Sequence, residues 1–449
     1  MQGNGPFSFL LPPRLAFIAL AAVAAWVVLG HWNAGAPQAP ASPSADAHRW
    51  SSELADELSR ATGDLVSRYL EQFLAEDEAA STDPELIGRF LDPQASARQQ
   101  RLDGWQLAAR GDDEAHAVLL QALRTGTPAQ RAAAAEALGR GRFADALAVL
   151  REMLADTDPS VVKGALSGLA GLRTDAATRL LEQVLADPSA APEIRIRSAA
   201  LLGEIGSAAA LQALKSAAAL SLDEDTLAAV MDGLGNYRFH DTAGVFRNLL
   251  ADPARDARLK AEATEALARS DQAALPFLLE TAAVAADPEV RASAAWAAGA
   301  NAHTGRIGPE LGRLLVHESD SEVRRRLYES LMLQQDSGGT AALQQAFGET
   351  EPAARIAGAN AVALAIRRDL ADAASIARFH GEHLPDLMTT ALGGGDRNLR
   401  YRAVFALVRA GTDEAAAVLG SIAAHGDREI AALAARGLSQ YSHFQDSNR

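Results

Sequence analysis

The segment His380-Gly-Glu-His383 places two imidazoles and one carboxylate within four residues, shortly before Gly393-Gly-Gly395. Imidazole and carboxylate groups are common zinc ligands, so His380, Glu382 and His383 are weak candidates for a metal site. No further ligand is evident from the sequence, and we therefore expect no metal and no cofactor. Inserted segments often carry function, and binding of a partner is the more natural use of this one.

A basic side chain recurs at one position of a repeated segment. The members are Arg131, Arg195, Lys260, Arg291, Arg324, Arg355 and Arg400. These side chains could form a cationic row for an acidic ligand. Alternatively, each could bond an aspartate or a loop carbonyl of the neighbouring segment, which would make them a structural ladder.

A second column of side chains lies five residues beyond the first. It comprises Glu136, Asp232, Glu265, Trp296, Glu329, Asn360, Phe405 and Arg436. Acidic and aromatic side chains on one exposed face could grip a segment of a partner protein. The alternative is ordinary solvated surface, with Trp296 and Phe405 partly packed between layers.

Catalytic signatures are not found in the sequence. The chain has no cysteine, which excludes disulfides, thiolate metal sites and a cysteine nucleophile. It has no glycine-rich nucleotide loop, no G-x-S-x-G and no H-E-x-x-H. We therefore expect a non-enzymatic protein. The alternative is an enzyme or metal-binding protein centred on an insertion near residues 371–395.

These columns belong to a segment that recurs ten times. Copies begin at Thr127, Asp158, Ala191, Asp223, Asp256, Asp287, Asp320, Glu351, Asp396 and Asp427, so the spacings are 31 to 33 residues except for one of 45. The first position suits a helix N-cap, and a proline often follows, as expected for the first helical residue. Apolar residues then recur at helical spacing, which predicts one buried face.

A second amphipathic stretch precedes each of these helices, so the repeated unit is a helix pair. Glycine often closes the second helix, and we expect Gly139, Gly203, Gly235 and Gly299 to be left-handed C-caps. The predicted fold is all-α, an α-solenoid of about ten pairs over residues 114–440, followed by a tail at 441–449. Residues 50–113 form either a membrane-proximal capping region or a degenerate eleventh repeat.

The segment Asp287-Pro-Glu-Val-Arg-Ala-Ser-Ala-Ala-Trp-Ala-Ala-Gly299 resembles the short HEAT repeats named after phycobilisome lyases. The resemblance implies stacked helix pairs whose second helices line the concave side. It also favours the structural ladder for the recurring basic residues. It does not indicate a function, because this fold serves many functions.

Enzymes with similar repeats do not match in their functional residues. Deoxyhypusine hydroxylases use repeated His-Glu pairs as iron ligands, whereas only His317-Glu318 has that form here. DNA glycosylases of this kind need a basic, aromatic groove. No residue set supports the activity of bilin lyases.

The N-terminus contains an apolar run at residues 15–33, preceded by Arg14. Its length and flanking charge predict a transmembrane signal-anchor, with residues 1–14 cytoplasmic and the bulk of the chain outside. Residues 34–49, rich in Ala, Pro and Ser, predict a linker. The expected location is a bacterial inner membrane, single-pass, with the solenoid in the periplasm. A cleaved signal peptide, a buried soluble helix and a cytosolic-facing adaptor remain alternatives.

The formal net charge is −15, which disfavours phosphate backbones. We therefore expect no nucleic-acid partner, and a protein partner that offers basic or neutral segments. Together, these features predict a membrane-tethered, protein-binding scaffold.

Overall fold

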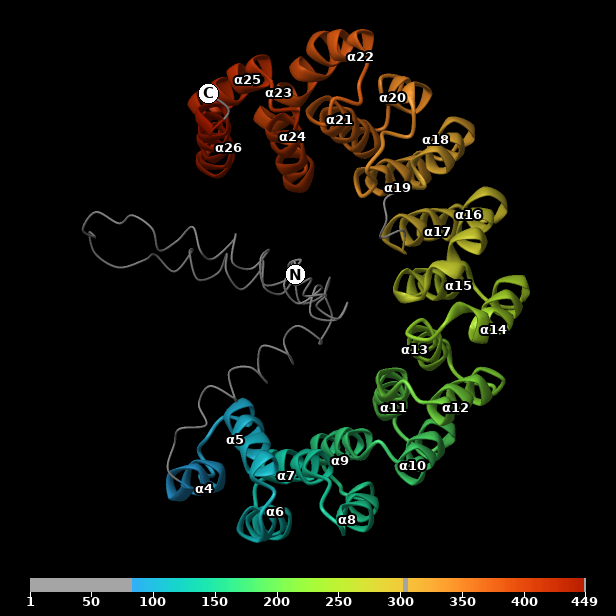
Figure 1. Ribbon diagram of the computed structural model, residues 1–449, viewed down its shortest axis with the longest axis vertical. Coiled ribbons are helices and arrows are strands. Elements are labelled where there is room, and N and C mark those ends of the chain that lie inside the picture. The colour runs from blue at the N-terminus through green and yellow to red at the C-terminus, as the bar shows by residue number, and fades with distance from the viewer. Residues whose placement is uncertain (1–82, 302–305, 448–449) are drawn as a thin grey trace, which may run out of the picture. The chain divides into compact units, whose positions relative to one another are not determined.

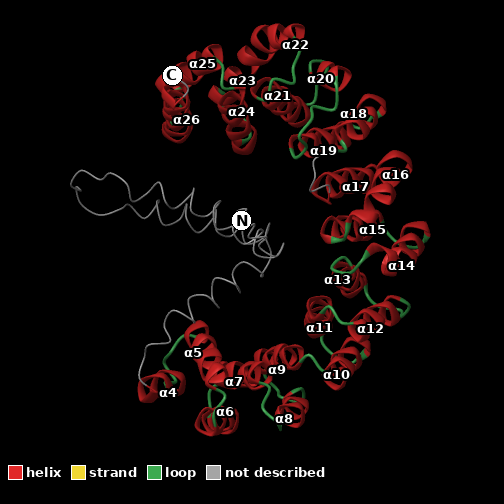
Figure 2. Cartoon of the chain, in the orientation of Figure 1, coloured by secondary structure: helices red, strands yellow, loops and turns green. Residues whose placement is uncertain are grey.

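The computed structural model describes residues 83–301 and 306–447, and all regular elements in these ranges are helices (Figure 2). No helix in this part of the chain combines the length and apolar character needed to cross a membrane. The expected membrane anchor at residues 15–33 and the linker at 34–49 lie outside the described residues.

The second helices of the pairs stack on one another in a continuous row. They are α5 (Ala97–Arg110), α7 (Pro128–Gly141), α9 (Pro159–Leu172), α11 (Pro192–Ile205), α13 (Glu224–Leu234), α15 (Ala257–Ala266), α17 (Pro288–Asn301), α19 (Ser321–Met332), α21 (Pro352–Arg367), α24 (Arg397–Ala410) and α26 (Arg428–Ser447). Within the described ranges, these helices lie on the inner side of the bend that successive pairs follow (Figure 1). We call them the inner row.

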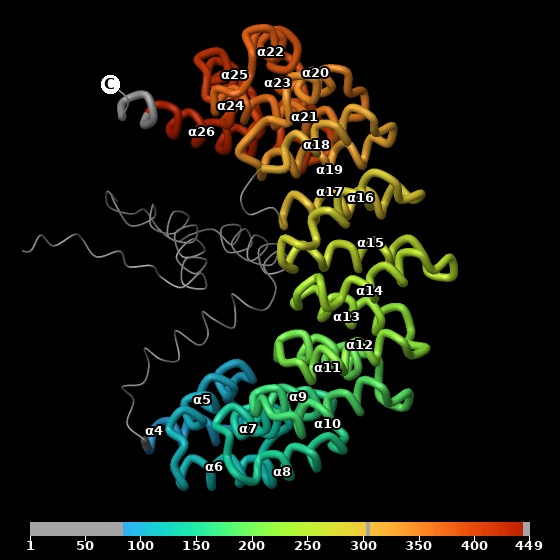
Figure 3. Tube along the Cα trace, turned by 45° about the vertical axis from the view of Figure 1, so that its right-hand side comes forward, coloured from blue at the N-terminus to red at the C-terminus, as the bar shows by residue number. Residues whose placement is uncertain are grey.

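The first helices form the outer row, which Figure 3 shows from a second direction. They are α4 (Asp83–Leu91), α6 (Asp113–Thr125), α8 (Ala146–Met153), α10 (Asp175–Ala186), α12 (Ala208–Ala218), α14 (Phe239–Ala251), α16 (Leu275–Val284), α18 (Gly308–His317), α20 (Thr340–Ala346), α22 (Ala373–Arg378), α23 (Leu384–Leu392) and α25 (Asp413–His425). Short 3₁₀ turns at Leu267–Arg269 and Gln272–Ala274 precede α16.

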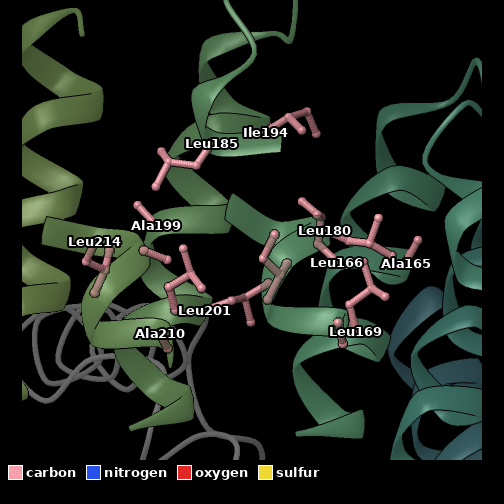
Figure 4. Packing of buried hydrophobic residues seen from close by; sticks show 14 of the residues in the cluster. Ala165, Leu166, Leu169, Leu180, Leu185, Ile194, Ala199, Leu201, Ala210 and Leu214 are labelled. Carbon is pink, nitrogen blue, oxygen red and sulfur yellow. The ribbon is translucent and has the colours of Figure 1, made fainter. Parts of the chain in front are cut away.

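Apolar side chains of both rows meet between them. Leu166 and Leu169 from α9, Leu180 from α10, Leu201 from α11 and Leu214 from α12 belong to one buried cluster (Figure 4). Each pair buries its apolar stripe against the adjacent pairs, as expected for a solenoid. The prediction of an all-α solenoid of stacked helix pairs is confirmed for the described residues.

The positions at which the inner helices begin were predicted correctly. Thr127, Asp158, Asp223, Asp256, Asp320, Glu351 and Asp396 each accept a hydrogen bond from a backbone N–H of the first helical turn. Such caps satisfy N–H groups that have no partner within the helix.

The predicted role of the closing glycines was wrong. Gly139, Gly203 and Gly299 lie inside α7, α11 and α17, and Gly235 follows α13 with a φ of −61°. Only glycine fits at these positions, because the neighbouring inner helices approach each other closely there. A Cβ on Gly139 would lie 1.9 Å from the carbonyl oxygen of Gly168 in α9. The chain instead turns left-handed at other residues, such as Arg142 (φ 53°) and Arg173 (φ 52°).

Both ends of the described stack extend beyond the expected limits of the solenoid. Helix α5 stacks on α7, and α4 packs against α5 and α6, so residues 83–110 form a further helix pair. At the other end, α26 continues to Ser447 through residues expected to form a tail.

The insertion near residues 371–395 is helical rather than a loop. Helix α22, the π-helical turn η4 (Phe379–His383) and α23 follow one another without a break. They pack against α20, α21, α24 and α25 and so extend the outer row.

Candidate functional site

The recurring arginines connect successive pairs, as the structural interpretation expected. The ion pairs are Arg131–Asp156 (Nη2–Oδ1 3.1 Å), Arg195–Asp223 (Nη1–Oδ2 3.0 Å), Arg291–Glu318 (Nε–Oε2 2.8 Å), Arg324–Glu349 (Nε–Oε1 2.7 Å), Arg355–Asp386 (Nε–Oδ2 2.9 Å) and Arg400–Asp427. Each arginine reaches an acid of the next pair. That acid lies just before the inner helix, except for Asp386, the partner of Arg355, which lies within outer helix α23.

Several ladder arginines also donate to carbonyls at the end of the preceding outer helix. Arg131 bonds the carbonyl of Gly126, Arg291 that of Ala285 and Arg400 that of Ala391. These carbonyls have no acceptor role within their own helix, so the arginine satisfies them while it joins two pairs. The guanidinium groups of the ladder arginines thus bond neighbouring helices of the stack rather than a ligand.

The acidic partners follow a rule that the sequence analysis missed. Asp156, Glu318 and Glu349 lie two residues before the cap of the next inner helix. Ser221 and His425 occupy this position at two other joints, and there the capping aspartate itself forms the ion pair with the arginine. The signal was therefore present in the sequence, in the residues just upstream of the aligned segment.

The pKa values of three ladder carboxylates, Asp156, Glu318 and Asp427, are lowered. Hydrogen bonds from Arg131 and from the Asp158 amide lower the pKa of Asp156, and the hydrogen bond from Arg400 lowers that of Asp427. Burial by itself would raise the pKa of Glu318, but hydrogen bonds from Arg291 and the Asp320 amide outweigh it, and the pKa is lowered.

These shifts predict an acid-sensitive ladder. A carboxylate whose folded pKa is lowered stabilises the fold above its unfolded pKa and loses that contribution as the pH falls through the folded value. We expect Arg131→Gln to be less stable than wild type at pH 7, with a difference that shrinks below about pH 4. Urea unfolding at several pH values measures this. A difference that stays constant over the whole range would contradict it.

The second column lies on the inner row, but its members differ in what they contact. Trp105 on α5 donates from Nε1 to Oε1 of Glu136 at 3.0 Å, and burial raises the pKa of Glu136. Arg140 lies over the Trp105 ring with 4.6 Å from its guanidinium carbon to the ring centroid. Glu136 is therefore part of a packed cluster.

Among the members of the second column on α13, α15 and α17, Asp232 is exposed, whereas Glu265 and Trp296 are half-buried. Asp232 pairs with Arg269 while its side chain stays 60% exposed. Glu265 accepts from Oγ of Ser293 at 2.9 Å. Trp296 is half-buried and packs partly against the core.

The next members lie on α19, α21 and α24, and Arg436 on α26 is exposed. Glu329 bonds Arg325 and Arg402, and Phe405 is 44% exposed. Asn360 is buried, and its amide donates to the carbonyls of Ile356 and Arg402. Asn360 thus joins neighbouring inner helices and is not offered to a partner.

The candidate metal ligands point to different neighbours. His383 is buried and stacks on Phe347 with 4.6 Å between ring centroids, and burial lowers its pKa to about 4. Glu382 pairs with Arg378 at 2.7 Å (Oε1–Nε), and His380 faces Glu414. No group of three potential ligands comes together within residues 83–301 and 306–447. The single His-Glu pair, His317-Glu318, supplies a ladder carboxylate instead.

Comparison with known proteins agrees with this architecture. Residues 91–170 and 116–194 match the family model described as HEAT repeats, so this part of the chain consists of HEAT repeats. No curated protein matches the chain.

Solved structures with similarity include human deoxyhypusine hydroxylase in complex with glycerol, at 18% identity and a TM-score of 0.27, over 61% of this chain and 99% of that one. Kap121p is similar at 12% identity and a TM-score of 0.44, over 95% of this chain and 57% of that one. Kap121p bound to Pho4p is similar at 12% identity and a TM-score of 0.40, over 83% and 50%. The chain therefore spans little more than half of Kap121p.

Proposed function

We propose that the chain is a non-enzymatic scaffold that binds another protein along its inner row. The observation that carries this proposal is the placement of one side chain of the second column on α7 and on each inner helix from α13 to α26. Several of these side chains, including Asp232 and Phe405, stay substantially exposed. A long face with regularly spaced polar and aromatic contacts suits an extended or helical protein segment.

The arrangement of polar groups supports binding rather than catalysis. The buried ion pairs and buried amides join one helix pair to the next, and so hold the inner row in a fixed geometry. A rigid surface loses little conformational entropy when a partner docks. The HEAT repeats over residues 91–194 are compatible with this proposal.

We further propose that the scaffold is tethered to a bacterial inner membrane by residues 15–33 and faces the periplasm. This part of the proposal rests on the apolar run and on Arg14 before it. Cell fractionation with N-terminal sequencing of the mature protein tests it. Recovery in the soluble fraction with an intact N-terminus would contradict it.

Affinity capture from membranes tests the binding function. The bait is compared with an inner-row variant (Asp232→Ala, Phe405→Ala) and with an outer-row variant (Val284→Ala, Val316→Ala), because Val284 and Val316 are also exposed, at 71% and 40%. We expect a partner that is retained by the wild type and the outer-row variant and depleted by the inner-row variant. Equal recovery with all three baits would contradict the proposal.

A further inference from the structure

Two neighbouring helices of the inner row, α21 and α24, contain six arginines and no aspartate or glutamate. This composition contrasts with the formal net charge of −15 for the whole chain. Arg355 and Arg400 belong to the ladder, where each pairs with an acid. Arg402 and Arg409 lie further along α24 and need a separate explanation.

Arg402, Phe405 and Arg409 share one face of α24, because residues three and seven apart lie close together on a helix. Phe405 is 44% exposed, although Val404 and Ala406 beside it are fully buried. Arg409 is half-buried and donates to the amide oxygen of Asn360, which is a neutral acceptor. Burial and the nearby charge of Arg402 lower its pKa. Among the described residues, no carboxylate forms an ion pair with Arg409.

The adjacent surface of α19 adds two more arginines. Arg402 reaches across α21, with 2.7 Å between its Nη1 and Oε1 of Glu329. Arg325 bonds both Glu322 and Glu329, and Arg326 lies 3.6 Å from Glu329 (Nη1–Oε2).

This group therefore sets four arginines against two carboxylates, and the two carboxylates are already shared among three of the arginines. We define the arginine patch as Arg325, Arg326, Arg402, Phe405 and Arg409. The patch keeps an excess of positive charge around one exposed aromatic ring.

We infer that the arginine patch binds an acidic segment of a partner protein. Carboxylates of that segment bond Arg402 and Arg409, and an apolar side chain between them covers Phe405. Arginine suits this role because its planar guanidinium can hold a carboxylate through two hydrogen bonds. The inference rests on the proposed function, and it replaces the expected basic or neutral segment with an acidic one at this end of the inner row.

The surrounding charges favour a short acidic peptide over a nucleic acid. Asp225 and Asp232 on α13, and Glu262 and Glu265 on α15, introduce acids further along the same row. A long phosphate backbone that followed the row would meet these acids, whereas a short segment stays on the patch.

Fluorescence anisotropy with the full chain tests the inference. The probe is a fluorescein-labelled peptide of alternating glutamate and leucine, and the comparison probes are its glutamine counterpart and a single-stranded oligonucleotide. We expect the glutamate peptide to bind, and Arg402→Gln and Arg409→Gln each to weaken binding about tenfold. Arg313→Gln is the matched control, because Arg313 lies on outer helix α18 and is 73% exposed.

Circular dichroism first shows whether each variant is folded. If Arg409→Gln does not fold, Arg402→Gln carries the test, because the side chain of Arg402 is 47% exposed. Equal binding of the glutamine peptide, no binding of either peptide, or an equal loss with Arg313→Gln would overturn the inference. Tighter binding of the oligonucleotide, abolished by the same substitutions, would overturn it in favour of phosphate recognition. If partner capture persists in these cases, the proposed function stands without this inference.

Discussion

Replacing Arg324 with alanine is expected to lower the free energy of unfolding by about 3–5 kcal/mol, because it leaves a buried carboxylate without its counter-charge. The Glu349 side chain is 0% exposed. Arg324 donates to it from Nε at 2.7 Å and from Nη2 at 2.8 Å, and the Tyr328 hydroxyl donates at 3.1 Å. Burial and the adjacent carboxylate raise the pKa of Tyr328, so its hydroxyl stays protonated and can still donate to Glu349. A neutral hydroxyl does not replace the lost positive charge.

Urea unfolding followed by circular dichroism measures this loss. Arg313→Ala is the matched control, since Arg313 is 73% exposed and its ion pair with Glu310 should contribute less than about 1 kcal/mol. The double variant Arg324→Leu, Glu349→Leu should recover much of the loss, because it removes both buried charges together. A loss for Arg324→Ala no larger than that of the control would show that Glu349 does not depend on Arg324.

Gly139→Ala is expected to destabilise the stack by about 3 kcal/mol, although alanine is normally the better helix former. The added Cβ would lie 1.9 Å from the carbonyl oxygen of Gly168 and 2.4 Å from its Cα. Both atoms belong to the backbone of α9, so the clash can be relieved only if α7 and α9 move apart. That movement would expose the buried faces of both helices.

Gly244→Ala provides the control for this effect. Gly244 lies inside helix α14, and nothing would approach a Cβ there within 4 Å. This substitution should therefore stabilise the protein by about 0.5–1 kcal/mol. Thermal or urea unfolding of the two variants gives the comparison. Stabilisation by both would mean that α7 and α9 do not approach as closely as described.

Much of the fold was predictable because capping residues and prolines mark where the inner helices begin. An aspartate before a proline, as at Asp158-Pro159, favours the same helix start wherever it occurs, and the apolar spacing after it fixes the buried face. The closing glycines were misinterpreted because a glycine near a helix end can supply either a left-handed turn or a close contact. Only the neighbouring helix at Gly139 distinguishes the two.

The ladder was only partly predictable. The arginines share one position and were found, whereas acids such as Glu349 lie upstream of the aligned segment and were missed. The spacing of 45 residues located the insertion correctly. It could not show that the extra residues extend an outer helix through a π-helical turn, because that depends on packing around Phe379 and His383.

The arginine patch was hidden for a different reason. Net charge was averaged over the chain, and this concealed a helix, α24, that has no acidic residue. Asn360 was assigned to the exposed surface by its position in the repeat. Its short side chain instead reaches the backbone of α24, so it is buried.

Site-specific photo-crosslinking in living cells tests the binding role of the inner row most directly. A photoreactive amino acid is placed at Asp232 or Phe405 on the inner row, and at Val284 or Val316 on the outer row. The proposed function predicts a crosslinked species with a second protein from both inner positions and none from the outer positions. Crosslinks from the outer positions alone, or from no position, would contradict it.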